Sequence, residues 1–414
     1  MITRNMITKL SEALTKFRII MLNGPRQSGK TTVVKTMAKQ LDMQYVTLDD
    51  PTALSLATDD PAGFLDFYAQ TPLVIDEIQF APELIAYIKI KVDNNNTKGQ
   101  FLLTGSADFL QMHKVTESLA GRMVRYNLYP IANAELYNKK YNMIDHLFSG
   151  EFKSLKNKTT KKQVLNNIIR GGYPEIITHD DDEFRGDWFD SYISARIQKD
   201  IQEYRQISLS KLRMIRKLLQ LLASYDAQLL NYNTLAKKLQ IDNKTVLSYV
   251  ELLQAMYIIK IIPSYHVNTA LRVVKSAKVY FIDTGLASYL LNMNTENLFI
   301  HKDGKYGGLI ENFVYCELIK EATYSQNSVE FHHFRDLRKK EVDLVLENRD
   351  GNIIGVEVKG KSNIKSQDVK GMVKLAEATK DKFLTGIVFY GGNEIRPISV
   401  EGHLFYCLPL GLLS

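Results

Sequence analysis

Cysteine is scarce in this chain, whose 414 residues include only Cys316 and Cys407. Two cysteines exclude a disulfide framework and a metal site built from a cysteine cluster. Long apolar runs are also missing, because no stretch approaches the ~20 residues that a membrane-spanning helix needs. The opening residues 1–6 lack the apolar core of a signal peptide. From these absences we expect a cytoplasmic protein without a membrane partner.

The composition is otherwise ordinary for a globular protein, with 45% hydrophobic and 24% charged residues. The length predicts roughly two to four domains, each able to bury its own core. The net charge is +7 and the isoelectric point is near 9.0. A basic balance permits nucleic-acid binding, but a mild excess of lysine also occurs on ordinary solvated surfaces.

Residues 24–31 fit the phosphate-binding pattern G-x-x-x-x-G-K-[ST]. An apolar run the length of a buried strand precedes them at residues 18–23, and helix formers follow at residues 32–41. A chance glycine-rich turn is the alternative, which the agreement of strand, loop and helix with the motif disfavours. The predicted nucleotide-binding residues are Gly24, Pro25, Arg26, Gln27, Ser28, Gly29, Lys30, Thr31 and Thr32.

The residue types of this loop suit a nucleoside triphosphate bound with Mg²⁺. Gly24 and Gly29 let the backbone bend so that its N–H groups point at phosphate oxygens. The helix that follows adds the positive end of its dipole. We expect Lys30 to reach the β- and γ-phosphates and Thr31 to offer its hydroxyl to Mg²⁺. We take the nucleotide to be ATP, although no base-reading residue distinguishes it from GTP.

Two carboxylates, Asp76 and Glu77, end an apolar run at residues 73–77. This is the Walker B pattern, in which Asp76 holds Mg²⁺ directly or through water and Glu77 orients or polarises the attacking water. A solvated acidic pair at a strand end is the alternative. The presence of the phosphate-binding pattern in the same chain disfavours it.

Two further polar positions follow in the same part of the chain. An apolar run at residues 101–106 ends in Ser106, a candidate sensor of the γ-phosphate, with Thr104 as second choice and a helix cap as the alternative. Arg122 follows a predicted helix end. It would stabilise charge on the transferring phosphoryl group or, equally, pair with a surface carboxylate. Strands and helices alternate to about residue 135, which predicts a parallel sheet covered on both faces, with ATP at the carboxyl ends of its strands.

The motifs GPRQSGKT, LVIDEIQ, FLLTGSADF and LAGRM resemble those of bacterial and archaeal AAA+-type ATPases with a C-terminal nuclease-like domain. Later stretches extend the likeness over nearly the whole chain: RGGYPE at residues 170–175, YFIDTGL at 280–286 and GGLIENFV at 307–314. The resemblance implies ATP binding. It also implies self-association into an oligomer, because such relatives often form rings in which arginines act across subunits. Whether Arg122 acts in cis or in trans stays open.

The middle of the chain is predicted to be helical. Residues 136–205 form a connector, and residues 206–290 are predicted to form three helices and two strands, the elements of a winged helix-turn-helix. The third helix, at residues 244–254, would enter a major groove of DNA through polar side chains near its start. A protein–protein spacer is a serious alternative, since this helix carries few basic residues. The candidate contacts are Asn243, Lys244, Thr245 and Ser248.

A predicted hairpin nearer the C-terminus brings two carboxylates together. Residues 341–347 alternate as a half-buried strand, residues 348–352 form a polar turn, and residues 353–359 form the returning strand. If the hairpin is centred near Asp350, positions whose numbers sum to about 700 face each other. Asp343 then lies opposite Glu357, with the Cβ atoms roughly 5 Å apart. Two like charges so placed repel each other unless a cation lies between them. Lys359 shares the face of Glu357.

Asp343, Glu357 and Lys359, together with Glu311 on an upstream helix, resemble the PD-(D/E)XK nuclease pattern, although valine replaces proline before Asp343. By this likeness, Asp343 and Glu357 bind Mg²⁺, and Lys359 steers or activates the water that attacks phosphate. Two alternatives stay open: the charges only solvate one face of the hairpin, or a nuclease-like fold is retained for binding alone. Three basic side chains just upstream could also meet phosphate: His332, His333 and Arg335.

The sequence therefore predicts an α/β protein of four parts. These are a P-loop AAA+-type ATPase core with a parallel sheet (residues 1–135), a helical connector (136–205), a winged helix-turn-helix (206–290) and a restriction-endonuclease-like α/β domain (291–414). The leading hypothesis is an ATP-hydrolysing protein that acts on DNA through the last two parts. The alternative is a nucleotide-switched protein-interaction module with an inactive nuclease fold.

Overall fold

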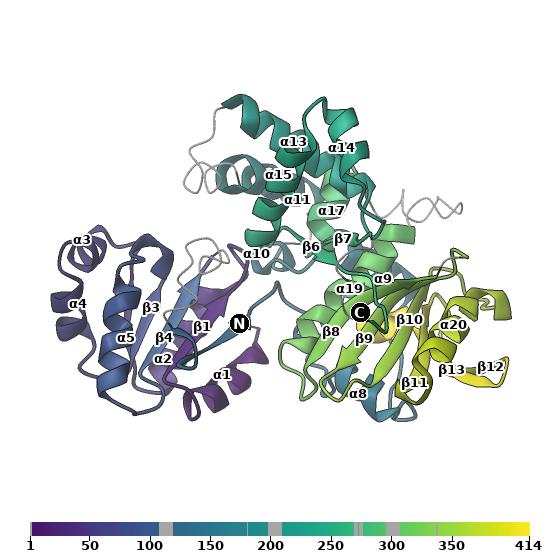
Figure 1. Ribbon diagram of the computed structural model, residues 1–414, viewed down its shortest axis with the longest axis horizontal. Coiled ribbons are helices and arrows are strands. Elements are labelled where there is room, and N and C mark those ends of the chain that lie inside the picture. Colours follow the sequence, from purple (N-terminus) through teal and green to yellow (C-terminus); the bar gives the residue numbers. More distant parts are fainter. Residues whose placement is uncertain are drawn as a thin grey trace. The chain divides into compact units, whose positions relative to one another are not determined.

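The computed structural model describes residues 2–106, 119–179, 181–197, 209–268, 272, 276–294, 307–336 and 338–414. The chain divides into two units, Met1–Ile131 with Ala255–Ile258 and Ala132–Gln254 with Ile259–Ser414. Figure 1 shows the helices and strands of both units. None of the described helices is both long and apolar enough to cross a membrane.

A five-stranded parallel sheet forms the centre of the first unit, in the order β2-β3-β4-β1-β5. Figure 1 labels its strands β3, β4 and β1. The central strands β3, β4 and β1 are buried along their whole length, and a strand covered on both faces appears in the sequence as an unbroken apolar run. This confirms the expected parallel sheet. The edge strand β5 escapes sequence prediction because its residues are only half-buried. The strands are β1 (Ile19–Asn23), β2 (Gln44–Thr47), β3 (Leu73–Asp76), β4 (Phe101–Gly105) and β5 (Met123–Asn127).

Helices cover both faces of this sheet. Met21 and Ile75 belong to a buried cluster with side chains of α3, α4 and α5, whereas Ile20 and Val74 belong to another with side chains of α1 and α2. Successive side chains of a strand point to opposite faces, which explains this division. Both faces of the sheet are therefore apolar, and polar groups gather at the strand ends. The helices are α1 (Met6–Leu14), α2 (Lys30–Gln40), α3 (Pro51–Asp59), α4 (Pro61–Tyr68) and α5 (Leu84–Asn94).

The second unit begins with a series of helices. A π-helical segment, Tyr192–Ile197, continues α11, and the rest of the predicted connector, residues 198–205, lies outside the described residues. Further along, α13, α14 and α15 precede the antiparallel strands β6 and β7, which are the elements that the winged-helix prediction requires. The bounds are α7 (Asn133–Leu136), α8 (Met143–Ser149), α9 (Lys161–Arg170), α10 (Pro174–Ile177), α11 (Asp182–Ser191), α13 (Leu209–Ser224), α14 (Tyr232–Leu239), α15 (Asn243–Ala255), β6 (Ile259–Ile262), β7 (Lys278–Phe281) and α17 (Thr284–Leu290).

A six-stranded mixed sheet follows in the order β12-β13-β11-β10-β9-β8 (Figure 1). In the antiparallel pair of β9 and β10, Leu344 lies opposite Val356 and Glu347 opposite Ile353, so the predicted register is confirmed. Side chains of α20, among them Met372, share a buried cluster with Val345 of β9. The bounds are α19 (Gly307–Ala322), β8 (Val329–Arg335), β9 (Glu341–Asn348), β10 (Ile353–Lys359), α20 (Lys370–Thr379), β11 (Phe383–Tyr390), β12 (Arg396–Val400) and β13 (His403–Pro409).

Candidate functional site

The predicted phosphate loop follows β1 and leads directly into α2. Gly24 has a φ of 154°, and a Cβ atom at this position would overlap the backbone carbonyl oxygen of Leu128. Gly29, with a φ of 93°, is the residue before α2 and lies in the left-handed region. Side chains disfavour this region because the Cβ atom crowds the backbone. Both glycines of the motif are therefore required by the path of the loop.

Lys30 lies buried within this loop. Its Nζ atom donates hydrogen bonds to the carbonyl oxygens of Gly24 and Pro25, at 2.9 and 2.8 Å. Only 4% of the residue is exposed. The curve of the loop thus surrounds a positive charge, as phosphate binding requires.

An arginine that the sequence analysis did not single out braces the same loop. Arg4 donates from Nη1 to the carbonyl oxygen of Ser28 and from Nη2 to that of Tyr129, both at 2.7 Å. Its side chain therefore ties the loop to the segment that follows β5. A lone arginine before the first helix belongs to no local pattern, so no sequence signal marks it.

The acidic pair reaches the same edge of the sheet as the loop, because β1 and β3 both flank β4 in the parallel order. Asp76 is buried and accepts hydrogen bonds from the hydroxyl groups of Tyr45, at 2.8 Å, and Thr104. Burial, reinforced by the charge of Asp76, raises the pKa of Tyr45, so its phenol remains a donor. Two hydroxyl groups therefore fix the orientation of this carboxylate.

Glu77 has a left-handed backbone conformation, with a φ of 60° and a ψ of 48°. Such a conformation costs a residue other than glycine on the order of 1–3 kcal/mol and persists where the surroundings enforce it, often at functional sites. The N–H group of Glu77 donates to Oγ1 of Thr104 at 3.0 Å. Gln79 donates from Nε2 to the carboxylate of Glu77 and, at 3.1 Å, to Oγ of Ser106. Thr104 and Gln79 thus hold the candidate residues in one network.

Three buried polar atoms of this region have no hydrogen-bond partner among the described residues: Asn23 Oδ1, Ser28 Oγ and Gln79 Oε1. Two of them lie near Gly105, where a Cβ atom would be 3.5 Å from Asn23 Oδ1 and 3.4 Å from Gln79 Oε1. Buried polar atoms without partners are rare, and an unseen water, ion or ligand commonly explains them. Unpartnered oxygen atoms suit the water ligands of a hydrated Mg²⁺ ion, and the loop around the Lys30 ammonium group suits phosphate.

Arg122 does not join these residues. It precedes β5, whose first residue, Met123, pairs with Ile19 at the amino end of β1, whereas the phosphate loop follows the carboxyl end. The length of β1 separates the two ends by roughly 16 Å. The guanidinium group of Arg122 pairs with Asp93, with Nε 2.5 Å from Oδ1. Of the two alternatives for Arg122, the structure therefore shows the surface ion pair. From this end of the sheet, Arg122 does not reach the phosphate loop of the same chain.

The four candidate nuclease-like residues do come together, all within the second unit. Lys359 donates from Nζ to Glu357 at 2.6 Å and lies 3.7 Å from a carboxylate oxygen of Asp343. The N–H group of Val358 donates to Oδ2 of Asp343 at 2.8 Å. Asp343 and Glu357 therefore lie at one end of the paired strands β9 and β10, as the predicted register requires.

Asp343, Glu357 and Glu311 form what we call the carboxylate cluster. Two residues of β7 connect Glu311 to the other two carboxylates, and sequence analysis assigned a site role to neither. Lys278 donates from Nζ to Oε1 of Glu311 at 2.7 Å and lies 3.7 Å from Oδ1 of Asp343. Tyr280 donates from its hydroxyl to the same oxygen of Glu311 at 2.6 Å. Both precede Asp343 by more than sixty positions, so no local spacing links them to it.

Burial and neighbouring charges set the protonation of the carboxylate cluster. Burial, with the charge of Asp343, raises the pKa of Glu311 to about 7. Burial also opposes ionisation of Asp343, but Lys278 and Lys359 outweigh it and lower the pKa of that carboxyl group. Near neutral pH, Asp343 is therefore ionised between two ammonium groups, while Glu311 is near the midpoint of its titration.

The other basic candidates of the second unit are less well placed. His332 and His333 are buried, and Arg335 pairs with Glu341, with 2.9 Å between Nε and Oε1. On α15, Asn243 and Lys244 are exposed. The buried histidines are thus not available to a phosphate group, whereas the start of α15 faces solvent.

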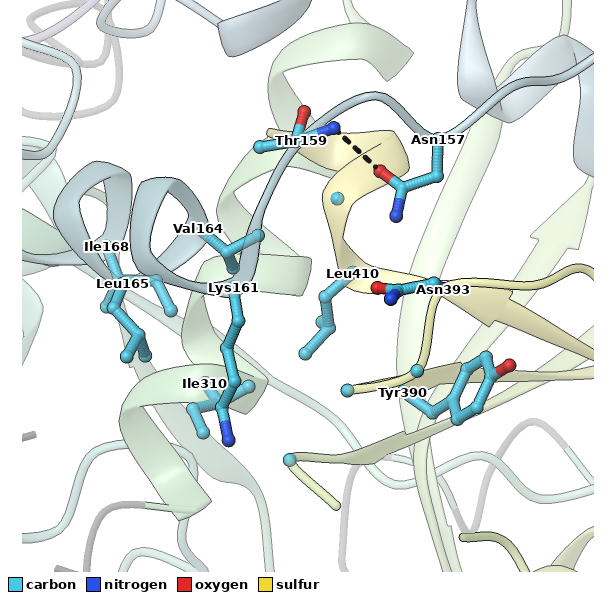
Figure 2. A pocket seen from close by; sticks show the side chains of 14 residues that line it. Asn157, Thr159, Lys161, Val164, Leu165, Ile168, Ile310, Tyr390, Asn393 and Leu410 are labelled. Atoms are coloured by element: carbon cyan, nitrogen blue, oxygen red, sulfur yellow. Dashed lines mark hydrogen bonds between the residues drawn. The ribbon is translucent and has the colours of Figure 1, made fainter. Parts of the chain in front are cut away.

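A small pocket opens beside the carboxylate cluster, and Ile310 and Gly360 in its lining directly adjoin Glu311 and Lys359 in sequence. Figure 2 shows Lys161, Val164, Leu165 and Ile310 on one side of it and Tyr390, Asn393 and Leu410 on the other. Its volume of about 40 Å³ has room for a few water molecules. Ligand pockets occupy roughly 300 Å³ or more, so we assign this pocket no ligand.

Comparison with protein families divides the chain into three matched regions. Residues 16–137 match an AAA domain, residues 161–297 match a domain of unknown function (DUF8612), and residues 306–413 match another (DUF4143). The AAA match covers the parallel sheet and the phosphate loop. It supports an AAA-type P-loop ATPase in this part of the chain, and the two later regions match families whose roles are unknown.

Several known proteins are similar to much of the chain. An uncharacterized protein of Mycobacterium tuberculosis is 27% identical over 357 residues, which cover 86% of this chain and 73% of the relative. An uncharacterized protein of Methanocaldococcus jannaschii is 23% identical over 431 residues, covering 94% and 83%. Among solved structures, a Walker-type ATPase of Pyrococcus abyssi matches 70% of this chain and 96% of its own, with 13% identity and a TM-score of 0.44. This low score adds nothing to the fold described above.

Proposed function

We propose that this protein is a Mg²⁺-dependent ATP hydrolase of the AAA type that acts on DNA through its second unit. One observation carries the ATPase part: the phosphate loop and the Asp76–Glu77 pair end strands at the same edge of one parallel sheet. Ligands of such sheets bind at the carboxyl ends of the strands. The four-part division with boundaries near residues 135, 205 and 290 belongs to this proposal.

In this proposal, residues 24–32 hold the triphosphate. The backbone N–H groups of the loop bind phosphate oxygens, and Lys30 exchanges its two loop carbonyls for oxygens of the β- and γ-phosphates. Thr31 and Asp76 would hold Mg²⁺, which would supply positive charge against the charge that develops on the phosphates. Tyr45 and Thr104 keep Asp76 oriented for this task.

Glu77 orients or polarises the attacking water in this scheme. The bond from Gln79 holds its carboxylate beside Ser106, and the bond from its own N–H group to Thr104 keeps its backbone at the strand end. Ser106 is the proposed sensor of the γ-phosphate. Exchange of these hydrogen bonds on nucleotide binding would release the Glu77 carboxylate toward water.

Replacement of Glu77 by glutamine tests the ATPase proposal. The amide keeps the shape of the side chain but cannot act as a base, so we expect turnover to fall roughly 100-fold or more, with affinity for MgATP retained. The measurement is phosphate release alongside equilibrium binding of a fluorescent ATP analogue. Glu83→Gln, on the segment just after Gln79, is the matched control and should hydrolyse ATP like the parent. A Glu77→Gln variant with parental turnover would refute the assignment.

For the second unit we propose a phosphodiester site at the carboxylate cluster. Asp343 and Glu357 would hold Mg²⁺, Glu311 would support it, and Lys359 would steer the attacking water, as the resemblance to PD-(D/E)XK nucleases implies. The convergence of these four side chains supports the proposal. DNA would be the partner, with the exposed start of α15 as an additional contact.

A second function is favoured by the position of Lys278. Its ammonium group lies 2.7 Å from Glu311 and 3.7 Å from Asp343, so it already neutralises carboxylates that a metal ion would need. Under this alternative, the chain is a nucleotide-switched interaction module whose nuclease fold is inactive. A metal ion would then have to displace a buried ammonium group, which costs the energy of its ion pairs.

Two measurements separate these functions. If the DNA proposal holds, affinity for DNA falls steeply with salt, and DNA incubated with Mg²⁺ or Mn²⁺ is cut by the parent but not by Glu357→Gln. Salt-dependent binding without cleavage under any condition would leave a DNA-binding protein with an inactive site. Absence of DNA binding would favour the interaction module.

A further inference from the structure

A second group of metal-ligating side chains lies on the paired strands β8 and β9. Glu330 pairs directly with Glu347 across the antiparallel ladder, and His332 lies two residues further along β8, on the same face. One ligand atom from each of the three side chains lies within 4.8 Å of the others. Two carboxylates in directly opposed positions repel each other unless a cation offsets them.

His332 is the residue that points to a ligand. It is 4% exposed, and neither of its ring nitrogens has a hydrogen-bond partner among the described residues. Its Nε2 atom faces both carboxylates, 3.6 Å from Glu330 Oε2 and 3.5 Å from Glu347 Oε2, which is too long for good hydrogen bonds. Burial, reinforced by Arg272, lowers the pKa of His332. The ring is therefore neutral and offers a lone pair, the form in which histidine binds metals.

The two distances from His332 Nε2 to the carboxylates, 3.6 and 3.5 Å, fit a four-coordinate metal ion. With Zn–N and Zn–O bonds of about 2.0–2.2 Å, two ligands at a tetrahedral angle are about 3.4 Å apart. We propose that Glu330, His332 and Glu347 bind a divalent transition-metal ion, Zn²⁺ by preference, with water in the fourth position. The Glu330 side chain is 79% exposed and has room to close on the ion. A Zn²⁺ ion bound to these three side chains would cross-link β8 and β9.

Arg272 orients the carboxylate of Glu347 in this arrangement. Its guanidinium group donates to both carboxylate oxygens of Glu347, at 2.6 and 3.3 Å, and stacks 4.4 Å from the ring centre of Tyr265. Partners of this kind orient ligating carboxylates in metal sites. One arginine against two glutamates leaves a net negative charge, which attracts a divalent ion. Glu347 and Asp343 are four residues apart on β9, roughly 13 Å, so the proposed ion is separate from the carboxylate cluster.

Titration of the metal-stripped full-length chain with Co²⁺ tests the proposal, because tetrahedral Co²⁺ absorbs visible light strongly whereas octahedral Co²⁺ does so weakly. The chain used as the parent should carry Asp343→Asn and Glu357→Gln, so that the carboxylate cluster does not bind Co²⁺. We expect a tetrahedral spectrum that saturates at one ion per chain and disappears when Zn²⁺ is added. Glu330→Gln, at an exposed position that does not threaten folding, should weaken Co²⁺ binding at least roughly tenfold, and His332→Asn should do the same.

His403→Gln, which changes a histidine of the same sheet outside this cluster, is the matched control and should bind Co²⁺ like its parent. A thermal scan provides a second readout: Zn²⁺ should raise the melting temperature of the parent but not of Glu330→Gln. The proposal is overturned if no tetrahedral spectrum develops, or if Glu330→Gln and His332→Asn bind Co²⁺ as tightly as the parent.

Discussion

At the scale of one residue, the burial of Glu311 makes the stability of the protein depend on pH. Burial, with the charge of Asp343, raises its pKa from the ordinary 4.5 to about 7. The native protein therefore keeps a proton that the unfolded chain loses over this range. The stability that this proton confers is fully present below about pH 4.5 and is lost as the pH rises through about 7, with a total effect of about 3 kcal/mol.

We expect the free energy of unfolding of the parent to fall with pH over this window more steeply than that of Glu311→Gln, whose amide does not titrate. Urea unfolding at about pH 4.5 and about pH 8 measures the difference, which should approach 3 kcal/mol. Glu377→Gln removes an exposed partner of Lys374 and should behave like the parent. The same pH dependence in parent and Glu311→Gln would show that Glu311 does not carry this proton.

Sequence reasoning located the residues that belong to short patterns and missed those that act from a distance. Lys30, Asp76 and Glu77 occur in local motifs, and the structure places them at one edge of the sheet. Arg4 and Lys278 contact these sites from positions far away in the chain. Without the fold, nothing distinguishes them from the other basic residues.

At the scale of elements, β4 links the two halves of the nucleotide site through Thr104. Its hydroxyl donates to Asp76 and accepts from the N–H group of Glu77. Thr104→Val keeps the shape of the side chain but removes both bonds. We expect ATP turnover to fall roughly 10- to 100-fold, because the acidic pair loses its fixed orientation, while MgATP binding changes little.

Steady-state hydrolysis together with equilibrium binding measures this effect. Thr36→Val is the matched control, since the Thr36 hydroxyl donates to the carbonyl oxygen of Thr32 within α2. Parental turnover in Thr104→Val would mean that β4 does not position the acidic pair. Loss of binding instead of turnover would mean that Thr104 acts on the nucleotide directly.

Whole elements were predictable where both faces are buried or where polar and apolar residues alternate. The buried strands β1, β3 and β4 are unbroken apolar runs, and the polar turn near Asp350 gave the register of β9 and β10 correctly. The half-buried strand β5 has neither pattern. Without β5, nothing in the sequence indicated that Arg122 lies at the amino end of the sheet.

At the scale of the whole molecule, the position of Arg122 bears on assembly. The arginine cannot reach phosphate in its own loop, so any role in hydrolysis requires a neighbouring copy of the chain. We expect MgATP to increase the mass of Glu77→Gln in solution, where slow turnover preserves the bound nucleotide. Arg122→Ala should then lower turnover of the otherwise unaltered protein without loss of MgATP binding.

Light scattering with and without MgATP measures the mass, and Arg349→Ala, at an exposed turn of the second unit, is the control for loss of a surface arginine. If the protein hydrolyses ATP as a monomer, the proposed assembly fails. If it assembles and Arg122→Ala retains full turnover, the arginine has only the structural role of pairing with Asp93.

The claim on which the account depends is that the loop around Lys30 binds a nucleoside triphosphate. Calorimetric titration with MgATP tests it most directly, in the parent, in Lys30→Ala and in Lys39→Ala, which changes an exposed lysine of the same helix. We predict one MgATP per chain in the parent and Lys39→Ala, and an affinity reduced roughly 100-fold in Lys30→Ala, since a charge-assisted bond to phosphate is lost. Equal affinity in Lys30→Ala and the parent, or no binding in the parent, would contradict the account.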